Sequence, residues 1–157
     1  MAAFATQSDL EIALGGADQL RQLSDFDRDG TADPAVVTDY LDSQAGEIRS
    51  VIEVKYEPET IASLDAASYR LLRDINKWKS ARQAWLEGGR GQAVPDRVQQ
   101  EADRSDQMLM EIRTGERRLG RVSGGNAPAL TQPIGVVDHD KDGSRVSVKA
   151  FRSYGYR

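Results

Sequence analysis

A regular spacing of apolar residues constrains the fold of this chain more than any other feature. Between Pro34 and Tyr56, apolar side chains recur every three or four residues over about six helical turns. This spacing places them on one face of an α-helix, with Asp33 as the N-cap and Pro34 as the first helical residue. Pro58 ends the helix. Because one face is apolar, the helix needs partner helices to cover that face.

Four further helices are predicted from capping residues, apolar spacing and glycine stops. The first spans residues 8–14 and begins at Ser8, which can form a capping box with Glu11. The others span 17–23, 60–87 and a stretch from 95 or 96 to 114. We therefore expect an all-α, bundle-like protomer of four to five helices, built from residues 1–120.

The composition changes after Gly120. Residues 121–157 mix Gly, Pro, Ser and Asn with isolated apolar side chains, as a linker or an extended arm does. They hold six Lys/Arg against three Asp, a net charge of +3, which leaves −7 for the rest of a chain whose total is −4. We expect an extended C-terminal arm that pairs as a short β-strand with neighbouring copies. Its predicted contact residues are Arg145, Lys149, Phe151, Arg152, Tyr154 and Tyr156.

Several function classes have little support in the sequence. His139 is the only histidine and no cysteine is present, so a catalytic triad or a zinc site has few residues from which it could be built. Residues 1–120, with their net charge of −7, repel the phosphate backbone of nucleic acids. No apolar run approaches the length of a membrane span. We expect a non-enzymatic, cytoplasmically made protein that neither grips DNA nor crosses a membrane.

The loop between residues 25 and 33 has the spacing of a calcium loop. Acids stand at its positions 1, 3 and 5, and a glycine stands at position 6. Position 12, where an EF-hand has a bidentate glutamate, is Val36. The candidate ligands of a Ca²⁺ ion are Asp25, Asp27, Asp29, the backbone carbonyl of Thr31, and Asp33.

A purely structural interpretation of the same loop stands beside the calcium site. Its aspartates can form Asx-turns, Gly30 can adopt a left-handed conformation, and Asp33 can simply cap the following helix. The sequence supports both interpretations equally.

The predicted helix over 60–87 pairs an apolar stripe, which ends at Leu86, with a row of basic residues. That row is Arg70, Arg73, Lys77, Lys79 and Arg82. Its members can form a solvated face with buried stems. Alternatively, they can meet an acidic helix face of a neighbouring copy, such as Asp39, Asp42 and Glu47, as a head-to-tail ring requires.

Three stretches together carry a resemblance to a known family. They are "FATQSDLEIALGG", "LSDFDRDGTADPAVVTDYLDSQAGEI" and "SDQMLMEIRTGERRLG", and their order and spacing cover residues 4 to 120. This arrangement resembles the small helical neck proteins of Mu-like tailed phages, which are head-completion or head-to-tail connector proteins.

The resemblance implies a structural protein of the virion neck that requires no cofactor. Such proteins form a ring, commonly of twelve copies, that docks on the portal protein and receives a tail-side stopper or tail terminator. DNA passes through the lumen without specific binding. The main rival hypothesis is a monomeric, calcium-responsive helical module built on residues 25–33. An enzyme or nuclease is a third and weaker hypothesis.

Overall fold

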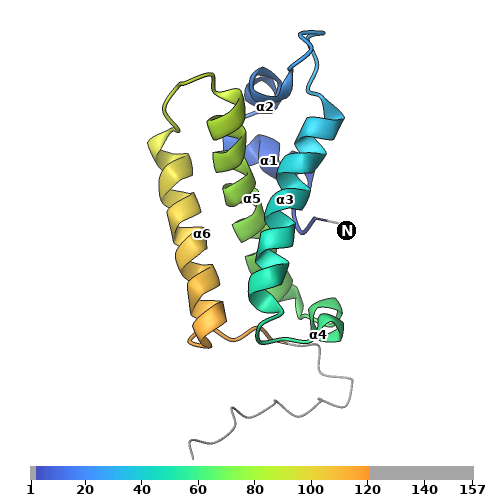
Figure 1. Ribbon diagram of the computed structural model, residues 1–157, viewed down its shortest axis with the longest axis vertical. Coiled ribbons are helices and arrows are strands. Elements are labelled where there is room, and N and C mark those ends of the chain that lie inside the picture. The colour runs from blue at the N-terminus through green and yellow to red at the C-terminus, as the bar shows by residue number, and fades with distance from the viewer. Residues whose placement is uncertain (1–2, 121–157) are drawn as a thin grey trace, which may run out of the picture. The chain divides into compact units, whose positions relative to one another are not determined.

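The computed structural model describes residues 3–120 of the 157-residue chain (Figure 1). Within this range the chain forms six helices and no strand, so the predicted all-α class is confirmed. The predicted division at residue 120 and the arm over 121–157 lie at and beyond the limit of the described residues and stay predictions. The helices are α1 (Gln7–Leu14), α2 (Ala17–Ser24), α3 (Pro34–Ile52), α4 (Pro58–Ala62), α5 (Ala66–Gly88) and α6 (Asp96–Thr114).

The first helix begins at a different capping residue from the one predicted. Thr6, and not Ser8, is the N-cap of α1. Its hydroxyl oxygen accepts a hydrogen bond from the backbone N–H of Asp9 at 3.3 Å, and the Asp9 carboxylate accepts one from the backbone N–H of Thr6 at 2.8 Å. The capping box therefore lies two residues upstream of the predicted one, because aspartate serves here in place of glutamate.

The predicted helix over 60–87 is split into α4 and α5. Asp65 is the N-cap of α5, and its carboxylate accepts a hydrogen bond from the backbone N–H of Ser68 at 2.7 Å. The backbone N–H of Asp65 donates to the carbonyl oxygen of Gly120 at 3.0 Å. The start of α5 is thus fixed both by its own cap and by the segment that follows α6.

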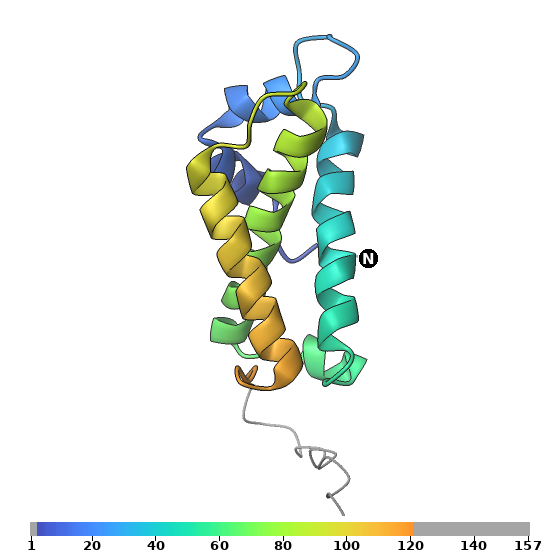
Figure 2. The same cartoon turned by 60° about the vertical axis from the view of Figure 1, so that its left-hand side comes forward.

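Helix α5 forms the centre of the domain and contacts α1, α2, α3 and α6 (Figures 1 and 2). Buried apolar side chains form one cluster around α1, α2 and the C-terminal half of α5. A second cluster joins α3, α6 and the N-terminal half of α5. The largest side chains that are fully buried include Leu10, Leu20, Tyr40, Ile48, Ile52, Leu72, Ile75 and Ile112.

Polar side chains on α5 join the helices through buried hydrogen bonds. The Asn76 amide donates to the carbonyl oxygen of Leu41 at 3.0 Å and accepts from the backbone N–H of Ala5 at 2.9 Å. The Ser80 hydroxyl donates to the carbonyl oxygen of Tyr40 at 3.0 Å. These bonds fix the register of α3 and of the N-terminal segment against α5, because each buried polar group would lose its partner if one helix moved along the other.

The end of α2 approaches α5 closely at Gly88. A Cβ atom added at Gly88 would lie 1.9 Å from the carbonyl oxygen of Leu23, so only glycine fits. The same carbonyl oxygen accepts a hydrogen bond from the Tyr40 hydroxyl at 3.3 Å. Burial, together with the charges of Glu87 and Asp39, raises the pKa of Tyr40 to about 12, so this hydroxyl stays a donor at every ordinary pH.

The last described residues are held against the opposite end of α5. Leu119 is buried, and its backbone N–H donates to the Tyr56 hydroxyl at 3.0 Å. The backbone N–H of Gly120 donates to the Ser68 hydroxyl at 2.7 Å. Among the helices of residues 3–120, none combines the length and hydropathy that crossing a membrane requires.

Candidate functional site

The acidic loop between α2 and α3 brings three carboxylates together. Oxygen atoms of Asp25, Asp27 and Asp29 lie within 4.8 Å of one another. The first two carboxylates also accept backbone hydrogen bonds inside the loop, from Gly30 at 3.1 Å and from Asp29 at 3.2 Å respectively. This arrangement has the Asx-turns of the structural interpretation and also the carboxylate convergence of a cation site.

The later positions of the loop are occupied by other contacts. The backbone N–H and hydroxyl of Thr31 each donate to one oxygen of Asp29 at 2.7 Å, and these bonds lower the pKa of Asp29. Asp33 accepts from the backbone N–H of Ala35 at 2.9 Å and so caps α3, as predicted. Val36, at the position of the missing glutamate, packs against the core. Only the first three aspartates therefore remain as convergent acidic ligands.

One oxygen of the loop stands apart from this pattern. Oδ1 of Asp25 is buried and has no hydrogen-bond partner, whereas its Oδ2 accepts the bond from Gly30. A buried carboxylate oxygen without a donor is costly, so this atom favours a ligand that supplies a cation or an N–H group.

The basic residues predicted to meet a neighbouring copy differ in their surroundings. Arg73 forms a two-pronged ion pair with the buried carboxylate of Asp9, with Nε at 2.9 Å from Oδ2. The hydrogen bonds from Arg73 hold the pKa of Asp9 down at about 2, against the opposing effect of burial. Arg73 is therefore committed to joining α1 and α5 within one protomer.

Lys77 and Arg70 have fewer internal contacts. Lys77 pairs with Asp74 at 2.7 Å, and its ammonium also lies 5.2 Å from the centre of the Trp78 ring. Arg97 covers the same ring at 5.4 Å. Arg70 is exposed and makes no ion pair with the part of the chain that the structure describes.

A charge network between α3, α5 and α6 was missed by sequence reasoning. Lys79 is only 3% exposed, and its ammonium donates to Glu47 at 3.0 Å and to Asp106 at 2.5 Å. Arg82 bonds the second oxygen of Asp106 at 2.8 Å. Burial raises the pKa of Asp106, but the hydrogen bonds from Lys79 and Arg82 outweigh this, so its pKa lies below the ordinary value. The alternation of acids and bases in sequence gives no signal that a lysine is buried.

A groove lies beside this network. Its lining comes from α3, α5 and α6, its volume is about 380 Å³, and it includes Gln44, Gln83 and Leu86. Leu86 was predicted on the apolar stripe of its helix, but its side chain is 69% exposed. Helices α3 and α6 flank the face of α5 that carries Leu86, and no helix within residues 3–120 covers this face.

Comparison of the chain with protein-family models, with curated proteins and with solved structures finds no match. The function is therefore inferred from the geometry above and from the resemblance in the sequence.

Proposed function

We propose that this protein is a structural subunit of a tailed-phage neck, which assembles as a ring between the portal protein and the tail-side stopper or terminator and lets DNA pass through its lumen. One observation carries the proposal: residues 4–120, which resemble the neck proteins, coincide with the folded helical domain. Within this domain Asp33 caps α3, and Gly30 in the acidic turn and Gly115 after α6 have left-handed backbone conformations, which supports the proposal.

Two exposed apolar side chains on opposite sides of α5 support assembly into a ring. Ile12 on α1 is 67% exposed, and Leu86 in the groove between α3 and α6 is 69% exposed. Helix α1 packs on the face of α5 that carries Arg73, whereas Leu86 lies on the opposite face. A head-to-tail interface needs two different faces of one protomer, and single exposed apolar residues at both faces suit it.

The internal ion pairs change which contacts the ring would use. Arg73, Lys79 and Arg82 are already paired within one protomer, so few cations of α5 remain for a neighbour. Contacts between copies would then depend on apolar side chains and on the arm, with Arg70 and Lys77 at the margin. The contacts that the helices make between copies should accordingly depend only weakly on salt concentration.

The size of the assembly formed by the full chain tests the proposal. Native mass spectrometry and electron microscopy of the purified protein, alone and mixed with portal rings, should show closed rings of identical subunits. Substituting Leu86→Asp should abolish them without loss of helicity, because a charge would be buried in the interface. Val54→Asp is the matched control, since Val54 is 67% exposed and lies beyond the end of α3, outside both faces. A chain that stays monomeric alone and with portal contradicts the proposal.

A low-affinity calcium site is a second candidate, favoured by the unpartnered Oδ1 of Asp25 within the aspartate triad. With three carboxylates and no bidentate glutamate, affinity should be far below that of a sensor. Calorimetry of the full chain with CaCl₂ should show weak binding that Asp27→Asn removes. Asp18→Asn is a matched control, since Asp18 lies on α2 and pairs with Arg21. Micromolar binding with a change in helicity would favour the calcium-responsive module over the ring.

A further inference from the structure

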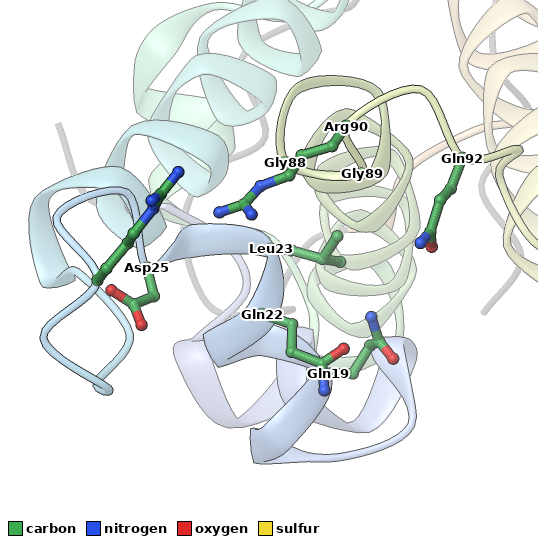
Figure 3. A pocket seen from close by; sticks show the side chains of 9 residues that line it. Gln19, Gln22, Leu23, Asp25, Gly88, Gly89, Arg90 and Gln92 are labelled. Carbon is green, nitrogen blue, oxygen red and sulfur yellow. The ribbon is translucent and has the colours of Figure 1, made fainter.

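A cavity of about 340 Å³ opens where α2, the acidic loop and the α5–α6 loop meet (Figure 3). Its floor is the close contact between Leu23 and Gly88. Figure 3 shows Gln19 and Gln22 on the α2 side, and the long side chain of Arg90 reaching from the α5–α6 loop toward α2. The lining of this cavity combines polar side chains with the apolar side chain of Leu23 and with Gly88 and Gly89.

Both strained non-glycine residues of the domain line this one cavity. Arg28 has a φ of 63° and Arg90 a φ of 48°, and no other non-glycine residue among the described ones has a positive φ. Arginine tolerates this conformation poorly. Such strain is concentrated at functional sites in proteins, and here two separate loops each place a guanidinium at the same cavity.

The polar groups of the cavity are free to bind. The guanidinium groups of Arg28 and Arg90 make no hydrogen bond or ion pair within residues 3–120, and the same holds for the side chains of Gln19, Gln22 and Gln92. Asp25 also lines the cavity, and its buried Oδ1 has no donor. The site therefore offers two forked cationic donors, three amides and one acceptor that needs an N–H group.

The chemistry of these groups fits a peptide that carries a carboxylate. Guanidinium groups bind carboxylates through paired hydrogen bonds. Amide side chains both donate and accept, as peptide units do, and a backbone N–H would satisfy Oδ1 of Asp25. A nucleic-acid strand fits less well than a peptide that brings one carboxylate, because Asp25, Asp27 and Asp29 stand beside the cavity and repel every phosphate that Arg28 and Arg90 do not bind.

We propose that this cavity is a docking site for a short acidic segment of a partner polypeptide, with Arg28 and Arg90 binding its carboxylate and the glutamines and Asp25 binding its backbone. This interaction goes beyond ring formation and does not depend on it.

Binding of a labelled peptide to the full chain tests this site. The probe is a short peptide of glycine and serine that contains one glutamate, and its matched control has glutamine in place of that glutamate. Fluorescence anisotropy should show that the acidic peptide binds to the protein and that the glutamine peptide does not. Arg28→Gln and Arg90→Gln should each weaken it by about tenfold, the loss expected for one charge-assisted hydrogen-bonded contact. Arg104→Gln, which makes the same charge change on the exposed face of α6, should leave binding unchanged.

Three outcomes would overturn the proposal. Equal binding of the glutamine peptide would show that the carboxylate is not recognised, and equal weakening by Arg104→Gln would show unspecific charge attraction. Displacement by inorganic phosphate at the peptide's own concentration, with chloride as the ionic-strength control, would show a simple anion site. Arg28→Gly and Arg90→Gly are the controls for folding, because glycine adopts the left-handed backbone conformation without strain. These variants should have a melting temperature no lower than that of the parent and should no longer bind the peptide. Ring assembly, measured separately by native mass, should be unchanged in all of them.

Discussion

Gly88→Ala is the substitution that most directly tests the packing of this domain. Gly88 is the last residue of α5, and in most helices alanine at such a place is tolerated or stabilising. Here the added Cβ atom would lie 1.9 Å from the carbonyl oxygen of Leu23 and 2.8 Å from its Cα atom. Because both are backbone atoms, no rotation of a side chain can relieve the contact.

The cost follows from how far α2 must move. The Leu23 carbonyl oxygen has to retreat from 1.9 Å to at least 3.0 Å, a shift of 1.1 Å for a helix whose Leu20 and Leu23 side chains are buried. Overpacking of this kind costs about 1–3 kcal/mol. Loss of the hydrogen bond from the buried Tyr40 hydroxyl adds about 1 kcal/mol, and the better helix propensity of alanine offsets about as much. We expect a net loss of about 1–3 kcal/mol.

Urea denaturation followed by far-UV circular dichroism measures this loss. Gly46→Ala is the matched control, because Gly46 lies inside α3 and a Cβ atom there would meet nothing within 4 Å. That control should be stabilised by about 0.5–1 kcal/mol, so the two glycine substitutions should shift the midpoint in opposite directions. If Gly88→Ala is as stable as the parent or more so, the close contact between α2 and α5 is wrong, and so is the floor of the cavity described above.

Three further predictions concern charged groups. Arg73→Gln should destabilise the fold at neutral pH, because the hydrogen bonds from Arg73 hold the pKa of Asp9 below its unfolded value of 3.8. The difference in stability from the parent should shrink as pH falls from about 4 to about 2, and Arg70→Gln should show no such pH dependence. Lys79→Met should lower the free energy of unfolding, measured by urea denaturation, by about 1–2 kcal/mol. This loss is smaller than that from breaking a fully buried ion pair, because both carboxylate partners of Lys79 are roughly half exposed. Asp33→Ala should lower stability by about 1 kcal/mol in thermal unfolding, whereas Asp33→Asn should retain the cap and most of the stability.

Much of the fold could be predicted because its signals are local. The apolar spacing of α3, the Asp33 cap and the glycine after α6 depend on neighbours a few residues away. The cap and the glycine appear in the structure as predicted, whereas α3 ends at Ile52, before the predicted end at Tyr56, and Pro58 begins α4. The split between α4 and α5 was missed. It depends partly on a local signal, the cap that Asp65 forms with Ser68, and partly on the hydrogen bond from Asp65 to Gly120, two residues that are far apart in the sequence.

The surroundings of the charged residues were the least predictable part. In sequence, Arg73 and Arg70 are equivalent members of one basic row, yet one pairs with a buried aspartate of α1 and the other is exposed. The difference comes from the position of α1 on α5, which only the packing of both core clusters determines. The cavity arginines gave no signal either, since positive φ at an arginine contradicts its intrinsic preference.

The acidic loop and the adjacent cavity are connected through a single residue. Asp25 belongs both to the aspartate triad and to the cavity lining, and its Oδ1 is the one carboxylate oxygen among these residues that is buried without a partner. A cation held by the triad would bind the carboxylate of Asp25 and would add positive charge beside Arg28. A peptide in the cavity would bond to the same carboxylate with an N–H group. The two ligands therefore compete for one carboxylate while the cation strengthens the attraction for the peptide carboxylate. The effect of calcium on the affinity for the acidic peptide therefore shows which interaction matters more. Calcium weakens peptide binding if the N–H contact to Asp25 dominates. Calcium strengthens peptide binding if the negative charge of the peptide carboxylate dominates.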